Sequence, residues 1–117
     1  MTLTKKERQS IYDKSGGHCW YCGCKLVKGW HVDHFKPVCR YSEGMDNPEN
    51  DVIENMVPAC AKCNLFKATF SIEDFRSELE LQIERARSYS VNFRTAERFR
   101  LVKVINEPVI FWFERQN

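Results

Sequence analysis

The chain has 117 residues, of which 43% are hydrophobic and 29% charged, and its formal net charge at pH 7 is +2. This length allows one modest hydrophobic core and excludes two, so we expect a single domain stiffened by metal. A charge this small neither requires nor excludes nucleic acid as a partner. The first residues lack an apolar signal sequence and no run reaches transmembrane length, which predicts a cytoplasmic protein with no membrane partner, whose six cysteines stay reduced.

A helix is predicted at the start of the chain. Thr4-Lys-Lys-Glu7 has the form of a capping box, in which the two side chains bond each other's backbone amides. The helix should continue to about Ser15, because Gly16 and Gly17 then end it.

Two cysteine pairs follow, Cys19-Trp-Tyr-Cys22 and Cys60-Ala-Lys-Cys63, with 37 residues between them. Two such pairs supply four thiolates at the spacing that tetrahedral zinc accepts, with no open position for catalysis, so we predict a structural zinc site. Gly23 can supply the positive φ that a zinc knuckle needs. A redox role for the pairs is less favoured, because no thioredoxin-like context surrounds them. Two cysteines are left over and are interpreted as spare or buried residues: Cys24 and Cys39.

Between the cysteine pairs we expect two short strands and a loop. Residues 29–34 alternate apolar and polar side chains, as in a half-buried strand, and residues 52–57 form a second extended segment that Pro58 ends. Alternation would send Asp33 and His34 to opposite faces, so they share a site only if the strand breaks at His34. Residues 41–54 are rich in turn formers and carry five acidic residues, which predicts a loop.

Residues 59–68 are helix formers. On a helix, Cys60, Cys63, Asn64 and Lys67 occupy positions i, i+3, i+4 and i+7, which lie on one stripe. One helix face would therefore present the second cysteine pair, an amide and a lysine toward the strand that carries Asp33.

The last third of the chain is predicted to hold a helix and a β-hairpin. Ser71-Ile-Glu-Asp74 is a second capping box, and an apolar stripe continues to about Arg87. Residues 89–100 are ambiguous. Residues 101–105 and 109–113 are rich in β-branched and aromatic side chains and flank a turn sequence, which predicts a terminal hairpin. A basic tract from Gln82 to Lys103 has six Arg or Lys and two Glu, typical of a solvated surface or of contacts to a nucleic-acid backbone.

The polar residues of this middle region form a set able to hydrolyse a phosphodiester. Asp33 and Asn64 supply hard oxygen ligands suited to Mg²⁺ or Mn²⁺. His34 has a side chain that exchanges protons near neutral pH and can take one from water. Lys67 can contact a phosphate oxygen as a point charge. Asn55 has no direct role, so we assign it to holding the loop that aims His34.

Four segments together resemble the HNH endonuclease family: Cys19-x-x-Cys22, Val32-Asp-His-Phe-Lys-Pro37, Asn55, and Cys60-Ala-Lys-Cys-Asn-Leu-Phe-Lys67. The resemblance implies an α+β fold with a ββα-metal core over about residues 16–70 and structural zinc. An N-terminal helix would flank it, as would a C-terminal extension over residues 71–117, all in one nuclease domain. It implies DNA as the partner and leaves RNA open as a substrate.

The resemblance also assigns roles to single residues. His34 is the first histidine of the motif and the general base, and Asn55 is the middle asparagine, with Asn50 as a weaker rival. Asn64 takes the last position, where many members have histidine. Asp33 and Asn64 would bind the catalytic cation, and the four paired cysteines the zinc.

Two other functions use the same cysteines. One is a catalytically degenerate, zinc-stapled module that binds nucleic acid. The other is a protein-interaction module, favoured if residues 111–113 form an exposed surface. We rank both below the nuclease, because they leave Asp33, His34 and Asn64 unexplained. His31 is either a substitute ligand or a residue of the strand surface, and we favour the second; His18 is interpreted as packing beside the first cysteine pair.

Overall fold

The computed structural model describes residues 2–116 and divides into two compact units. Unit 1 comprises the residues up to Ile72 and those from Ile110 onward, and unit 2 comprises Glu73–Val109. The boundary after Ile72 falls close to the predicted end of the core near residue 70. None of the described helices is long and apolar enough to cross a membrane.

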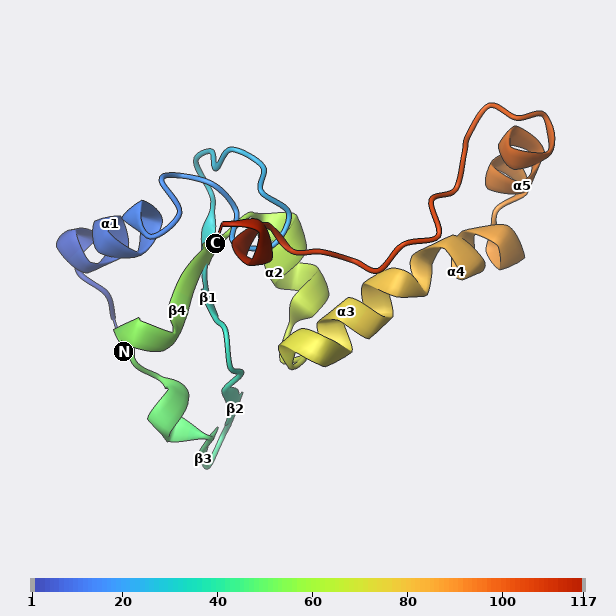
Figure 1. Cartoon of the computed structure of the whole chain (residues 1–117). Coiled ribbons are helices and arrows are strands. Elements are labelled where there is room, and N and C mark those ends of the chain that lie inside the picture. Colours follow the sequence, from blue (N-terminus) through green and yellow to red (C-terminus); the bar gives the residue numbers. More distant parts are fainter. Residues whose placement is uncertain (1, 117) are drawn as a thin grey trace. The chain divides into compact units, whose positions relative to one another are not determined.

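Unit 1 begins with helix α1, Lys5–Asp13, which starts at the predicted capping box (Figure 1). Thr4 Oγ1 accepts a hydrogen bond from the amide of Glu7, and Glu7 Oε1 accepts one from the amide of Thr4. Ile11 is fully buried and anchors the helix against strand β4. Two glycines with positive φ, Gly16 and Gly17, follow the helix end as expected.

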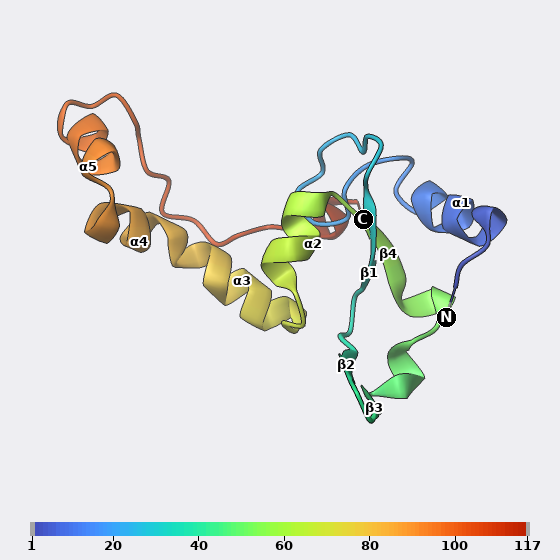
Figure 2. The same cartoon turned by 180° about the vertical axis from the view of Figure 1, so that it is seen from behind.

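The centre of unit 1 is a two-stranded antiparallel sheet of β1, His31–His34, and β4, Met56–Ala59. Helix α2, Ala61–Lys67, follows β4 and lies against β1 in both views (Figures 1 and 2). The first strand ends at His34, which is the break that a site shared by Asp33 and His34 would require. The second strand was predicted over residues 52–57, which is too early in the sequence. It begins at Met56 and continues through Pro58, which an outer strand tolerates because its second edge needs no amide donor.

The predicted acidic loop has more structure than its composition indicated. Strands β2, Cys39–Tyr41, and β3, Gly44–Asp46, form a small hairpin, and two single 3₁₀ turns follow at Pro48–Asn50 and Ile53–Asn55. The prediction of a loop was therefore wrong where this hairpin and the two 3₁₀ turns lie. Short strands with exposed side chains give little hydrophobic alternation for a sequence pattern to detect.

An aromatic cluster completes unit 1 and corrects the prediction of a C-terminal β-hairpin. No strand follows Ala59 in the described residues. Instead, a 3₁₀ helix at Trp112–Arg115 docks on the first cysteine pair, where the amides of Trp112 and Phe113 donate to the carbonyls of Tyr21 and Trp20. Phe111 is only 2% exposed, so these residues do not form the exposed partner surface that a protein-interaction module would need. The apolar residues at 111–113 therefore reflect packing in the core of unit 1 and not a β-strand.

Unit 2 consists of helices α3, Ile72–Glu80, α4, Gln82–Tyr89, and α5, Val91–Arg98, followed by an irregular segment to Val109. The single helix predicted to Arg87 is interrupted at Leu81. Ser90 caps α5 by accepting a hydrogen bond from the amide of Phe93, which resolves the ambiguous region as helix. Val109 returns to α3, where its carbonyl accepts from Arg76 and its amide donates to Glu80.

Candidate functional site

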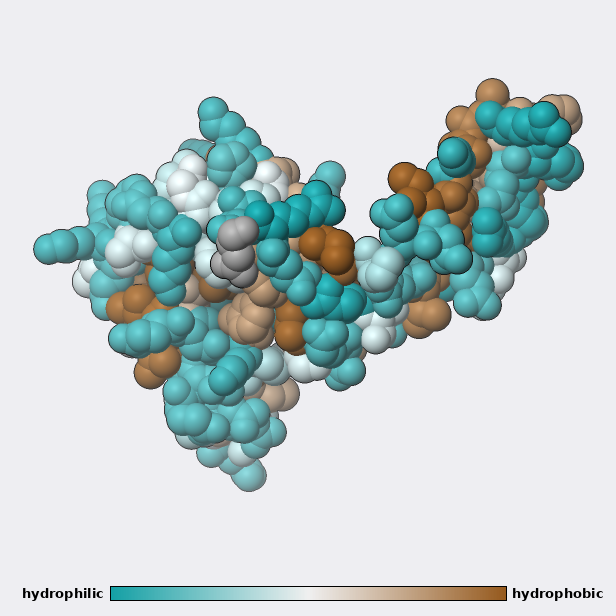
Figure 3. All heavy atoms as spheres, viewed as in Figure 1, coloured by the Kyte–Doolittle hydropathy of each residue, from teal (hydrophilic) through white to brown (hydrophobic). Residues whose placement is uncertain are grey.

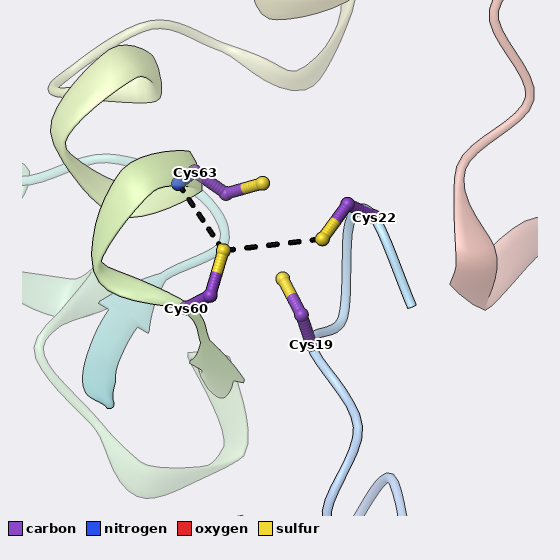
Figure 4. A group of neighbouring side chains, drawn as sticks. All are labelled: Cys19, Cys22, Cys60 and Cys63. Carbon is purple, nitrogen blue, oxygen red and sulfur yellow. Dashed lines mark hydrogen bonds between the residues drawn. The ribbon is translucent and has the colours of Figure 1, made fainter. Parts of the chain in front are cut away.

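Four cysteine sulfurs converge between the turn at residues 19–24 and the start of α2 (Figure 4). The Sγ atoms of Cys19, Cys22, Cys60 and Cys63 all lie within 4.8 Å of one another. Cys22 and Cys60 are 3.9 Å apart. Four thiolates around a tetrahedral zinc, each about 2.3 Å from it, would be separated by roughly 3.8 Å. The cluster can therefore hold a metal ion and is compatible with structural zinc.

Local backbone geometry brings each pair together. Gly23 has a φ of +81° and donates its amide to the carbonyl of Cys19 at 3.0 Å, which closes the first turn. Cys60 is the N-cap of α2, and its sulfur accepts a hydrogen bond from the amide of Cys63 at 3.4 Å. The amide of Trp20 donates to the carbonyl of Pro58 at 2.8 Å, so the first turn is joined to the strand that leads into the second cysteine pair.

The cysteines differ in their affinity for protons. A hydrogen bond from the thiol of Cys63 lowers the pKa of Cys19 against the opposing effect of burial, and backbone amides contribute in the same direction. Donating that proton raises the pKa of Cys63. A cluster that already favours a thiolate at its buried member is suited to a cation. The two spare cysteines, Cys24 and Cys39, lie outside the cluster and are exposed, not buried as one interpretation had it.

Asp33 points toward α2 and is buried, with 6% of its surface exposed. Its Oδ2 accepts a hydrogen bond from the Tyr21 hydroxyl at 2.5 Å and lies 3.1 Å from Nζ of Lys67. Lys67 is itself fully buried and also donates to the carbonyl of His34 at 3.0 Å. The ammonium is therefore placed inside the molecule, which differs from the predicted contact with a substrate phosphate. It is engaged instead as the counter-ion of Asp33.

Asn64 also lies between α2 and β1. Its Nδ2 is 2.7 Å from Nδ1 of His31, so the amide nitrogen donates to the ring and the Oδ1 oxygen points elsewhere. His31 and Asp33 lie on one face of β1 because residues i and i+2 of a strand share a face. The structure thus brings Asp33 and Asn64 to the same β1–α2 interface and gives His31 a contact that the sequence did not indicate.

His34 lies on the other face of β1, as strict alternation required. Its Nε2 is 2.8 Å from Oδ1 of Asp51, and Oδ2 of Asp51 lies 3.5 Å from the guanidinium of Arg40. The hydrogen bond with His34 lowers the pKa of Asp51, so the carboxylate is ionised at neutral pH. Asp51 is a site residue that sequence reasoning missed, because five acidic residues in one segment give no sign of which one meets a histidine.

Asn55 bridges two segments of chain beside His34. Its Oδ1 accepts from the amide of Lys36 at 2.9 Å, and its Nδ2 donates to the carbonyls of Lys36 and Asn50, each at 2.8 Å. Its own carbonyl accepts from the amide of Phe35 at 2.8 Å. These contacts hold the backbone just after His34. Asn50, the weaker rival, makes a single longer side-chain contact, 3.4 Å to the carbonyl of Pro37.

The predicted residues therefore form two groups and not one. Asp33 and Asn64 share the β1–α2 interface with Lys67, whereas His34 pairs with Asp51 on the opposite face of β1. The described contacts do not join His34 to Asp33 or Asn64 through their side chains.

Residues 19–69 match the family model HNH endonuclease, which confirms the resemblance inferred from the sequence. A relative in Acanthamoeba polyphaga mimivirus, named uncharacterized protein R423, is 30% identical over 74 residues, or 63% of this chain. The chain spans only 12% of the length of that relative. No solved structure matches the chain significantly.

Proposed function

We propose that this chain, whose residues 19–69 match the HNH endonuclease family, is a metal-dependent endonuclease that hydrolyses phosphodiester bonds in DNA. The observation that carries the proposal is the environment of His34 at the end of β1. Its imidazole is half-buried, oriented by a carboxylate at 2.8 Å, and adjacent in sequence to an acid at the β1–α2 interface. If no histidine were held in this way by a carboxylate, the family match would support binding of nucleic acid and not its cleavage.

His34 is the general base of the proposed reaction. Asp51 engages Nε2, which leaves Nδ1 as the ring nitrogen that accepts a proton from the attacking water. The negative charge of Asp51 stabilises the imidazolium that forms. Asn55 fixes the backbone after His34 through Lys36 and so keeps the ring in position.

Asp33 and Asn64 are the residues that would hold a catalytic Mg²⁺ or Mn²⁺. Their donors suit such ions, because both offer oxygen ligands and both lie at the β1–α2 interface. The cation would stabilise the charge that develops on the phosphate. His31 takes a hydrogen bond from the Asn64 amide nitrogen and thereby leaves its Oδ1 as the available ligand. Lys67 balances the charge of Asp33 and positions it.

The cysteine cluster has a structural part in this proposal. We assign zinc to it because four thiolates leave no open coordination position. The cluster ties the start of α2 to the turn at residues 19–24, and α2 carries Asn64 and Lys67. The zinc would therefore hold the cation-binding helix in place without touching the substrate.

The direct test is cleavage of supercoiled plasmid DNA with added Mg²⁺ or Mn²⁺. Wild-type protein should convert it to nicked or linear forms, and His34→Ala should lower the rate about 100-fold or more. His18→Ala is a matched control, since His18 stacks on Trp112 and makes no contact with β1 in the described contacts. Equal rates for wild type and His34→Ala would refute the assignment and point to a contaminating nuclease.

A second function has one observation in its favour. Because His34 faces away from Asp33 and Asn64, the chain could serve as a zinc-stapled module that binds nucleic acid without cutting it. That function predicts tight binding of DNA by wild-type protein and no cleavage with any divalent cation. The plasmid assay therefore separates the two.

A further inference from the structure

Unit 2 carries basic side chains that the proposed active site does not use. Between Arg85 and Lys103 the sequence has six basic residues and a single acidic one, Glu97. From Glu73 to Glu84 it has five acidic residues and a single basic one. Along the sequence of unit 2, acidic residues therefore come first and basic residues follow, although the net charge of the unit is nearly zero.

Two of the six cations are neutralised locally. Arg85 pairs with Glu78 and Arg87 with Glu97, each at 2.7 Å. Within the described part of the chain, the other four have no carboxylate partner: Arg94, Arg98, Arg100 and Lys103. Their charge is available to an external anion.

These four cations lie beside exposed apolar side chains. On α5, Val91, Arg94 and Arg98 share one exposed face at i, i+3 and i+7. From Arg98 to Lys103 every residue is exposed, and the apolar Phe99 and Leu101 are 67% and 78% accessible. Hydrophobic residues are visible at the surface of this unit along the segment that follows α5 (Figure 3).

We call the following six residues the basic arm surface: Arg94, Arg98, Phe99, Arg100, Leu101 and Lys103. The guanidinium of Arg98 lies 5.3 Å from the centroid of the Phe99 ring, so a cation and an aromatic face are presented together. Such a combination fits nucleic acid, whose phosphates take the cations and whose bases stack on aromatic rings. In a duplex the base faces are already stacked on one another, and only a single strand offers them to Phe99.

We propose that the basic arm surface binds single-stranded nucleic acid, with Phe99 stacking on a base and Arg98, Arg100 and Lys103 contacting phosphates. The choice of nucleic acid over an acidic peptide rests on the proposed nuclease function. The surface then selects substrates with unpaired strands, such as flaps, loops or melted ends.

Binding is measured by fluorescence anisotropy with a labelled 20-nucleotide single strand of mixed sequence and with the matching duplex. The full chain carrying His34→Ala is used without added divalent cation, so that nothing is cleaved. The single strand should bind more tightly than the duplex. Phe99→Ala should weaken single-strand binding about five-fold or more and leave duplex binding almost unchanged. Val27→Ala, which truncates an exposed apolar residue of unit 1, is the control and should have no effect.

The cations are tested by salt dependence. Arg100→Ser with Lys103→Ser should reduce the slope of log K against log salt by about 1.4, that is by about 0.7 for each phosphate that the protein no longer neutralises. Arg85→Gln removes a cation of the same unit that is already paired with Glu78, and it should leave the slope unchanged.

Three results would overturn the inference: duplex bound as tightly as single strand, Phe99→Ala without effect, or self-association of the chain that Phe99→Ala abolishes. The last would show that a second copy covers the surface. Because binding is measured in the His34→Ala protein, which should not cleave, the result for the basic arm surface does not depend on the result for the nuclease. If wild type binds DNA but never cleaves it, only the nuclease proposal is contradicted. If wild type cleaves plasmid but Phe99→Ala does not weaken single-strand binding, only the proposal for the basic arm surface is contradicted.

Discussion

Single residues at the two faces of β1 carry the chemistry of the proposal. The His34–Asp51 pair lies on one face, and the buried Asp33–Lys67 pair lies on the other. His34 and Asp33 could be proposed as site residues from the sequence, because an acid next to a histidine at a strand end is a local pattern. Their partners could not, since Asp51 and Lys67 reach them only through the fold.

Asp51→Asn keeps the shape of the side chain and removes the charge that orients His34. We expect plasmid cleavage to slow by about ten-fold or more, with DNA binding unchanged. Glu54→Gln is the matched control, an exposed acid of the same segment that makes no contact with His34 in the described structure. A wild-type cleavage rate in Asp51→Asn would show that the contact has no catalytic role.

The same pair predicts a pH dependence of stability. The pKa of Asp51 is lowered in the folded state by its hydrogen bond with His34, so the pair stabilises the fold above the unfolded-state pKa of about 4. That stabilisation disappears as pH falls through the depressed folded value. Urea midpoints of wild type and Asp51→Asn should therefore differ at pH 5 to 6, and the difference should shrink as the pH falls below about 4. A difference that stays constant as the pH falls below that value would contradict this.

Lys67→Met is predicted to be strongly destabilising, because it leaves the carboxylate of Asp33 buried without its counter-ion. Removing one partner of a buried pair costs about 3 to 5 kcal/mol. The double variant Lys67→Met with Asp33→Asn should recover much of that stability, since it removes the unpaired charge. Urea unfolding of both variants measures the difference. A destabilisation below about 1 kcal/mol in the single variant would mean that Lys67 is not the counter-ion of Asp33.

At the scale of elements, short-range patterns were sufficient for α1, β1 and α2. The capping box at Thr4, the alternation up to His34 and the stripe on α2 all depend on neighbours in sequence. The hairpin β2–β3 and the docking of residues 111–115 were missed because they depend on tertiary contacts. Phe111 and Phe113 have the composition of a strand, but the aromatic core around Tyr21 and Phe35 decides their conformation.

The first cysteine turn requires glycine at position 23. Its φ is +81°, and a Cβ there would lie 2.5 Å from Cδ1 of Trp112. Gly23→Ala should therefore cost more than the roughly 1 to 2 kcal/mol expected of a left-handed backbone alone. Gly29→Ala is the matched control, with a φ of +96° and no atom within 4 Å of the added Cβ. Equal unfolding free energies for the two variants would show that Trp112 moves aside at no cost.

The metal cluster makes a prediction about the second cysteine pair. We expect one tightly held zinc per chain by elemental analysis, and Cys60→Ala should abolish zinc binding and lower the stability of the fold. Cys39→Ala should keep the zinc, because Cys39 lies outside the cluster and is exposed. A folded, fully active protein without zinc would contradict the structural assignment.

For the whole molecule, the sequence predicted a metal-stapled α+β core, followed by a helix and a β-hairpin over the last third of the chain. The cysteine spacing and the Asp-His-Asn set are short signals, and the family match over residues 19–69 agrees with them. The arrangement of α3, α4 and α5 as a separate unit was not predicted, because helix breaks at Leu81 and Ser90 are set by packing and capping. The proposed preference for single strands belongs to this scale, since unit 2 carries the basic arm surface.

Chemical rescue tests the central claim, that the imidazole of His34 takes the proton from water. His34→Gly leaves space for a free imidazole in the place of the side chain. We predict that millimolar imidazole restores plasmid cleavage to His34→Gly, in proportion to its concentration and to its neutral fraction, while wild type shows no such increase. Failure of imidazole to accelerate a His34→Gly protein that still binds DNA, or wild-type activity in His34→Gly without imidazole, would contradict it.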